Sequence, residues 1–473
     1  MNKSRVDTDV RRPVLYQICR AGDRFEVGDG PFDLSRLRVL ILGRGAEGGY
    51  DARANEDVIR VADPWMSSRH AALMRDGARH MVKDMGSTNG VLLNSKRVAE
   101  ARLETGDLIE TGRTFWVYLL LPLEPAPPIE PVSFGEMASW SPSLAATLTA
   151  LSKAARGVSP ILITGEQGVG KEYCAKAIHL VSCRPGRLIT VDAGKLPREK
   201  HLPELLGTQD VRAGALCLSS GGTLMIHRVD ALAKEAQEAL LDAVAGGRVV
   251  PPNGGRPVNV DLRVVTSTEA DLMGLARRGK FNVDLAEALS AVRAHLPPLR
   301  ERPEDLGLLM DQLLARAGGA HAITRDAARA LLNYPWPRNV RELSKVLEGG
   351  AILAGDEAAV DLRHLPGVVA QRPGTQQDVE GLVTGDHAQH QPQDPETTSP
   401  GDPGFDNDPH TRGPEQEFAA TDPDERIRQP RGRGQPVPPP PARTPPPPPP
   451  PPLKPQAPPP PAAPKILGKK KPR

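Results

Sequence analysis

Short apolar runs separated by turn-forming residues dominate the first quarter of the chain. Gly, Asn, Asp and Ser separate runs with strand character at 38–42, 58–61, 70–74, 81–84, 91–93 and 114–120. Many short strands with such punctuation are typical of an all-β sandwich. We therefore predict a β-sandwich domain over residues 14–122. A proline-rich linker, stiff rather than floppy, follows up to residue 131.

The hydrophobic pattern changes after this linker. Apolar strands such as 160–164 and 262–266 alternate with helical stretches such as 171–181 and 234–245. Such alternation favours a parallel sheet flanked by helices. We predict an α/β subdomain over residues 133–302.

Two further segments complete the predicted organisation. Residues 303–366 have a helical pattern that Pro335 and Pro337 interrupt, which indicates a small helical lid. Residues 367–473 hold more than half of the 51 prolines and end in a basic cluster at 469–473. This composition cannot bury enough apolar surface to offset the entropy of ordering, so we predict a disordered tail with polyproline II segments.

Composition adds little to this picture except by exclusion. The net charge of +2 gives no reason to expect attraction of the whole chain to a membrane or to nucleic acid. Four widely spaced cysteines form neither a metal-binding pair nor a disulfide framework, and this suggests a reducing cytoplasm. We expect no signal peptide, no metal cluster and no membrane partner.

Three short motifs lie in order within the predicted sandwich: Gly43-Arg44, Met66-Ser67-Ser68-Arg69-His70-Ala71 and Gly86-Ser87-Thr88-Asn89-Gly90. Together they resemble the forkhead-associated (FHA) domain, a β-sandwich whose loops at one end recognise phosphothreonine. The resemblance covers roughly residues 38–120. It implies that Arg44 and Ser67 bind phosphate, that Thr88 supports it, and that Asn89 grips the peptide backbone.

The chemistry of these residues fits a phosphate ligand, because a guanidinium gives charge-assisted hydrogen bonds to phosphate oxygens. The family usually has Ser-Arg where this chain has Ser67-Ser68. Either Arg69, one position later, supplies the second phosphate contact, or that contact is weakened. An ordinary Asn-Gly turn and a solvated arginine would explain any single motif, but three motifs at this spacing favour phosphopeptide binding.

The α/β subdomain carries a glycine-rich loop, which follows an apolar strand and begins a helix: Gly165, Glu166, Gln167, Gly168, Val169, Gly170 and Lys171. This context is the one that a phosphate-binding loop requires. Backbone N–H groups and the helix N-terminus would hold phosphates, with Lys171 as the cation. The usual Ser or Thr after the lysine is replaced by Glu172. The alternative is that the glycines remain only because the fold needs a tight turn there.

Two later segments, 297–302 and 334–343, make the resemblance more specific. They are similar to the AAA+ domain of bacterial enhancer-binding proteins, the activators of sigma-54 RNA polymerase, and the resemblance spans about residues 135–366. That family also carries Glu after the loop lysine, so Glu172 conforms to it. The resemblance implies that Arg341 is the sensor arginine of the lid. It also implies ATP as the ligand, with Mg²⁺ only if nucleotide binds.

Departures from the family pattern concern hydrolysis. His227 and Arg228 replace the acidic pair that holds magnesium and polarises the attacking water. Glu269 replaces the sensor asparagine, and Asn282 and Ala288 stand where the family has arginine fingers. The loop that contacts the sigma factor is also absent, so we predict a domain that binds ATP or assembles but does not hydrolyse, with no catalytic residues.

The resulting hypothesis is a cytoplasmic signalling protein in a transcription-regulatory pathway. Its FHA domain would bind a phosphothreonine partner linked to a Ser/Thr kinase, and its AAA+ domain would form homo- or hetero-oligomers. Specific DNA binding by this chain is not expected, because no helix-turn-helix pattern follows residue 366. Two alternatives stay open: an active ATP-dependent sigma-54 activator, and an inhibitor that assembles with active family members.

Overall fold

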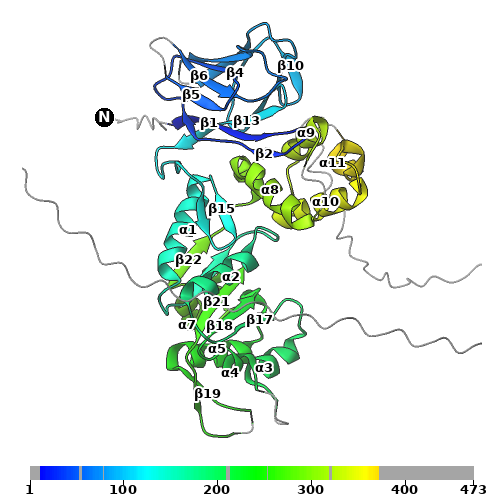
Figure 1. Ribbon diagram of the computed structural model, residues 1–473. Helices are drawn as coiled ribbons and strands as arrows, with labels where there is room; N and C mark the ends of the chain where they lie inside the picture. Colours follow the sequence, from blue (N-terminus) through cyan, green and yellow to red (C-terminus); the bar gives the residue numbers. More distant parts are fainter. Residues whose placement is uncertain are drawn as a thin grey trace, which may run out of the picture. The chain divides into compact units, whose positions relative to one another are not determined.

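The computed structural model describes residues 11–371 except 53–55, 78, 209–212, 253 and 319–321 (Figure 1). Most of the predicted tail lies outside the described residues. Its first positions form a short helix, α11 (Gly367–Ala370), in which Val369 is buried.

The N-terminal module is a sandwich of two sheets, and we call it the sandwich. The first sheet has the order β10-β9-β12-β13-β1-β2, and β3 also pairs with β1. The second has the order β11-β8-β7-β4-β6-β5. The prediction of an all-β first domain is confirmed. The strands are β1 (Arg11–Arg20), β2 (Glu26–Val27), β3 (Phe32–Asp33), β4 (Val39–Arg44), β5 (Gly49–Asp51), β6 (Asp57–Val61), β7 (Ala71–Asp76), β8 (Arg79–Asp84), β9 (Val91–Leu93), β10 (Lys96–Val98), β11 (Glu100–Arg102), β12 (Asp107–Thr111) and β13 (Thr114–Pro122).

Strand β1 was not among the predicted strands, and both of its faces are buried. Leu15 points into the core between the two sheets, while Val14, Tyr16 and Ile18 belong to a second core on the outer face. Side chains alternate between faces along a strand, so an apolar residue at nearly every position requires cover on both sides. The paired strand β13 is built in the same way.

The α/β module has an all-parallel sheet with the order β17-β18-β21-β16-β22 (Figure 1). It begins with a hairpin, β14–β15, that packs on α1 and α2. The prediction of an α/β domain is confirmed. The elements are β14 (Val132–Phe134), β15 (Met137–Ser139), α1 (Pro142–Ala154), β16 (Ile161–Thr164), α2 (Lys171–Ser182), β17 (Leu188–Asp192), α3 (Arg198–Leu206), α4 (Ala215–Leu218), β18 (Thr223–His227), η1 (Val229–Ala231), α5 (Lys234–Gly246), β19 (Arg248–Val249), β20 (Val258–Asn259), β21 (Arg263–Thr268), α6 (Leu272–Arg277), α7 (Val283–Leu289) and β22 (Val292–His295).

The lid is helical, as predicted, and its apolar faces pack against the outer face of the sandwich. Ile18 and Phe115 of the sandwich share one buried core with Leu306, Leu331 and other lid residues. The lid elements are η2 (Leu299–Glu301), η3 (Pro303–Asp305), α8 (Leu306–Ala317), α9 (Arg325–Asn333), α10 (Asn339–Ala354) and η4 (Leu362–His364), followed by α11.

Close backbone contacts fix this junction between sandwich and lid. A Cβ atom on Gly307, at the start of α8, would lie 2.0 Å from the carbonyl oxygen of Ile18, so only glycine fits there. The backbone N–H of Gly22 donates to the carbonyl of Ile323 at 2.9 Å. One hydrophobic core therefore contains residues from both the first strands and the last helices of the described chain.

Within the described part of the chain, no helix combines the length and the apolar character that crossing a bilayer requires.

Candidate functional sites

Loops at one end of the sandwich bring together three of the predicted phosphopeptide residues. Arg44 ends β4, Ser67 lies between β6 and β7, and Thr88 lies between β8 and β9. The backbone N–H of Arg44 donates to the Ser67 carbonyl at 2.9 Å, and the N–H of Thr88 donates to Ser67 Oγ at 3.2 Å. These two bonds hold the three residues in a small polar cluster.

A buried histidine ties the same loops together. His70 Nδ1 accepts from the backbone N–H of Ser67 at 3.0 Å, and Nε2 lies 3.0 Å from the carbonyl oxygen of Gly90. The first bond requires an unprotonated Nδ1, so the ring is the neutral tautomer that donates from Nε2. His70 therefore braces these loops.

Asn89 contacts the neighbouring loop, because its Nδ2 donates to the Trp65 carbonyl at 2.7 Å. The half-exposed Trp65 ring carries the Arg113 guanidinium 4.7 Å from its centroid. The buried Asp63 anchors this arrangement by accepting from the backbone N–H groups of Trp65 and Arg113 and from Thr114 Oγ1. No sequence motif marks Trp65, Arg113 or Asp63, so none of the three was predicted as a site residue.

The two predicted phosphate-binding arginines differ in their surroundings. Arg69 forms a two-pronged ion pair with Glu56, with N–O distances of 2.5 and 2.8 Å. A phosphate would have to replace that carboxylate. The exposed Arg44 side chain has no ion pair with any described residue. Arg44 is therefore the cation that is free to meet a phosphate at this cluster.

The glycine-rich loop lies between β16 and α2, and three of its glycines have positive φ: 145° at Gly165, 81° at Gly168 and 112° at Gly170. A side chain is strained in such conformations. At Gly168 a Cβ atom would also lie 2.2 Å from the Arg338 carbonyl oxygen of the lid. Lys171 folds back on the loop, and its Nζ donates to the carbonyls of Gly165 and Glu166 at 2.7 and 2.8 Å.

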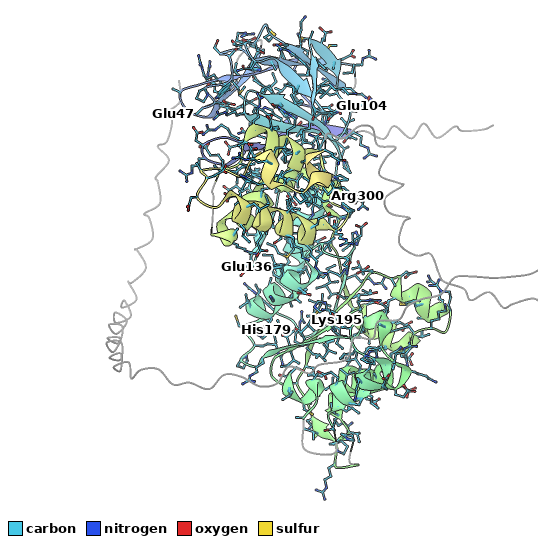
Figure 2. The ribbon with its side chains drawn as sticks, turned by 90° about the vertical axis from the view of Figure 1, so that its right-hand side faces the viewer. Glu47, Glu104, Glu136, His179, Lys195 and Arg300 are labelled. Carbon is cyan, nitrogen blue, oxygen red and sulfur yellow. The ribbon has the colours of Figure 1, made fainter. Side chains whose placement is uncertain are left out.

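A cavity of about 530 Å³ opens between this loop, the hairpin, the sheet and the lid. Its size falls in the range of small-molecule sites. Figure 2 labels two residues that line it, Glu136 from the hairpin turn and Lys195 from the loop after β17. Most of the predicted nucleotide-site residues also line the cavity: Gln167, Gly168, Val169, Gly170, Lys171, Glu172, Arg341, His227, Arg228 and Glu269.

The remaining predicted positions lie elsewhere. Gly165 and Glu166 belong to the loop but do not line the cavity. Asn282 is the N-cap of α7, where its side chain accepts from the Leu285 N–H at 3.0 Å. Ala288 lies on the same helix, and neither residue reaches the cavity of its own chain.

β18 ends in an imidazole, His227, and a guanidinium, Arg228, follows it directly. His227 Nδ1 lies 3.0 Å from Ser267 Oγ, and its Nε2 is 3.7 Å from a Glu172 oxygen. Burial lowers the pKa of His227, which favours the neutral ring. Arg228 has a left-handed backbone, with φ 51°, and its side chain crosses Gly194.

A charge cluster beside the loop was missed from the sequence. Arg300 and Asn339 belong to the two segments that resemble the AAA+ family, and Glu166 belongs to the loop itself. Arg300 forms a two-pronged pair with Glu166 and lowers the pKa of that carboxyl to about 2. The buried Asn339 donates to Glu166 Oε2 and to the Gln167 carbonyl, and it accepts from the Leu299 N–H. These bonds fasten the lid to the phosphate-binding loop.

Magnesium does not fit the residues present. Mg²⁺ prefers oxygen ligands, usually carboxylates together with substrate phosphates. In the described ranges, no group of three His, Cys, Asp or Glu side chains could hold a metal ion. The end of β18 offers an imidazole and a guanidinium instead.

Matches to protein-family models agree with this architecture. An FHA domain covers residues 40–112, a sigma-54 interaction domain covers 137–295, and an AAA+ ATPase lid domain covers 300–381. Over these residues the chain thus matches an FHA domain followed by a sigma-54 interaction domain and an AAA+ lid, and the predicted resemblance is confirmed.

Individual relatives share the AAA+ part. The chain is 33% identical over 258 residues to the transcriptional regulatory protein XylR of Pseudomonas putida, covering 51% of this chain and 46% of that protein. It is 35% identical over 254 residues to the response regulator PilR of Pseudomonas aeruginosa, covering 50% and 56%. The chain thus spans about half the length of the curated relatives it matches.

Solved structures add one further comparison. NtrX from Brucella abortus, crystallised with ADP, is 29% identical with a TM-score of 0.47, and the match covers 52% of this chain and 59% of that one.

Proposed function

We propose that this protein is a regulatory adaptor that binds a phosphothreonine partner through its FHA domain. The observation that carries this proposal is the exposed Arg44, which forms no ion pair with a described residue and whose backbone is bonded into the loop cluster of Ser67 and Thr88. A guanidinium and short hydroxyl or amide donors are the groups that phosphate monoester recognition uses. Asn89, one residue beyond Thr88, would hold the peptide backbone. The partner would be a substrate of a Ser/Thr kinase.

The AAA+ domain would bind ATP without turning it over. The positive-φ glycines, Lys171 and Arg341 around the cavity support nucleotide binding. Hydrolysis needs a group that orients and polarises water and a group that stabilises the charge of the transition state. His227 and Arg228 stand in place of the two carboxylates that would bind magnesium and polarise the water. Asn282 serves as a helix cap where the family places an arginine finger.

On this proposal the chain consists of four parts: the FHA domain at 14–122, the α/β subdomain at 133–302, the lid at 303–366 and the tail at 367–473. The AAA+ domain acts as an interaction or oligomerisation scaffold in transcription regulation, and the chain itself does not read DNA. Two other functions are supported by specific observations. Similarity to regulators such as XylR favours an active sigma-54 activator. The finger positions Asn282 and Ala288 favour an inhibitor of mixed assemblies.

ATP turnover over a range of protein concentrations separates these functions, with Lys171→Ala as the blank. We expect no turnover above the blank, whereas clear turnover that Lys171→Ala abolishes would restore the activator function. Co-purification with an active family member would favour the inhibitor.

Phosphopeptide binding tests the FHA role. A degenerate phosphothreonine peptide library should bind the intact chain, and Arg44→Ala should lower retention by about tenfold or more, the effect of a lost charge-assisted contact. Arg69→Ala is the matched comparison, because Arg69 is already paired with Glu56. Unchanged retention by Arg44→Ala would overturn the recognition role.

A further inference from the structure

Parallel strands place their carboxyl ends at one edge of the sheet, and here that edge faces the cavity. β17 ends at Asp192, β18 at His227 and β21 at Thr268, and His227 pairs directly with Asp192 in the sheet register. Arg228 and Glu269 directly follow two of these strands and also line the cavity. The chemistry of this edge decides how the charge of a bound polyphosphate is balanced.

Three carboxylates near the loop already have a cationic neighbour. Asp192 pairs with Lys195 at 2.8 Å, and Glu269 lies 3.8 Å from Lys171. Glu172 lies 4.0 Å from Arg341 and 3.7 Å from His227. A divalent cation would have to compete with these groups for the three carboxylates.

The Arg228 guanidinium, in contrast to these carboxylates, has no charged partner: no described residue forms an ion pair or a side-chain hydrogen bond with it. Its side chain is exposed to the cavity and passes over Gly194, where a Cβ atom would lie 2.5 Å from Arg228 Cδ. The missing side chain at Gly194 therefore gives Arg228 its path along the cavity wall. The left-handed backbone at Arg228 is held by the Ala231 N–H, which donates to the Arg228 carbonyl at 2.9 Å.

We propose that the cavity binds a nucleoside triphosphate as the free anion, without Mg²⁺, and that Arg228 supplies the positive charge a metal ion would otherwise bring. This inference rests on the proposed nucleotide binding. A fixed guanidinium offers several N–H donors to phosphate oxygens and repels a divalent cation from the same place. Lys171 and Lys195 add positive charge on either side, and they exchange their present partners for phosphate oxygens when the anion enters.

Calorimetric titration of the full chain with ATP tests the proposal, in excess EDTA and in excess Mg²⁺. We expect the affinity in EDTA to equal or exceed the affinity in Mg²⁺. Arg228→Gln, which removes the charge and leaves a shorter polar side chain, should weaken binding in EDTA by about tenfold or more, the effect of one charged hydrogen-bond partner. Arg248→Gln, on β19 and outside the cavity, is the matched control and should bind as the unmodified chain does.

The double variant His227→Asp with Arg228→Glu restores carboxylates at the end of β18. It should bind ATP far more weakly in EDTA and regain affinity when Mg²⁺ is added. Thermal unfolding of each variant without nucleotide confirms that it folds. Binding by the unmodified chain only with Mg²⁺, or unchanged binding by Arg228→Gln in EDTA, overturns the inference. Absence of binding under both conditions instead overturns the proposed nucleotide binding itself.

Discussion

The buried ion pair between the sandwich and the lid gives a direct test of their shared core. Arg329 on α9 donates from Nε and Nη2 to the two oxygens of Glu110 on β12, both at 2.6 Å. Glu110 is only 2% exposed. In Arg329→Ala, this carboxylate loses its principal partner while remaining enclosed by the junction.

The magnitude follows from this burial. Removing one partner of a buried ion pair costs about 3–5 kcal/mol, because the other charge is left without compensation. Arg325 lies 3.6 Å from Glu110 and survives the substitution, so we expect the lower part of that range, about 3 kcal/mol. Replacing both Glu110 and Arg329 with methionine should recover most of the loss, since an apolar pair of similar size leaves no buried charge.

Urea unfolding followed by tryptophan fluorescence measures this effect. The chain has four tryptophans, so the signals are read from variants that keep only the buried Trp116, in the sandwich, or only the buried Trp336, in the lid. Arg363→Ala is the matched control, because its pair with Glu357 is exposed and such pairs contribute about 1 kcal/mol or less. The shared core predicts that Arg329→Ala shifts the signals of both modules together.

An Arg329→Ala chain no less stable than Arg363→Ala would refute this reasoning. So would a shift in the lid signal alone, since it would show that the sandwich does not depend on the junction.

Three further predictions concern other parts of the molecule. Burial, followed by the charge of Asp305, raises the pKa of Glu304 to about 8 from an ordinary 4.5. The protonated Glu304 carboxyl therefore stabilises the folded chain fully below pH 4.5, and this contribution is lost as pH rises through 8. Unfolding free energy measured from pH 5 to 9 should therefore fall, and Glu304→Gln should flatten the decline; an equally steep decline in the variant would contradict this. Gly168→Ala places a methyl group against the Arg338 carbonyl at a φ that disfavours alanine. We therefore expect the free energy of unfolding to fall by at least about 1 kcal/mol and ATP to bind more weakly in calorimetry. An unchanged unfolding free energy and an unchanged ATP affinity would show that the lid moves aside freely. Asn282→Ala removes the N-cap of α7 and should cost about 1 kcal/mol in thermal or urea unfolding, while Asn282→Asp should keep the cap, and equal losses in the two variants would count against a capping role.

The parts of the fold that depend on local pattern could be predicted from the sequence. Punctuated apolar runs indicated the sandwich, and the strand–glycine loop–helix order indicated the turn that positions Lys171. Positions that require a positive φ, such as Gly168, can be recognised in the sequence because few residues other than glycine adopt that conformation.

The junction could not be predicted in this way. β1 is apolar on both faces, but the second face is covered by α8, which lies hundreds of residues later in the chain. Hydrophobic periodicity shows that a face is buried and does not show what covers it.

Pairings between side chains were also beyond the sequence. The bond of Arg69 to Glu56 and that of Arg300 to Glu166 depend on how loops meet in space. The motif around Arg69 indicated a candidate phosphate contact, whereas the structure shows the carboxylate with which a phosphate must compete.

The shared core also has a consequence for the order of events during synthesis. Glu110 and Arg329 lie 219 positions apart, and ribosomes add about 5–20 residues per second. The outer face of β1 and β13 therefore waits about 10–40 s after leaving the ribosome before the helices that cover it are made. During that interval Tyr16 and Phe115 are open to the surrounding medium, and slower translation lengthens the time in which the nascent sandwich can associate with other chains.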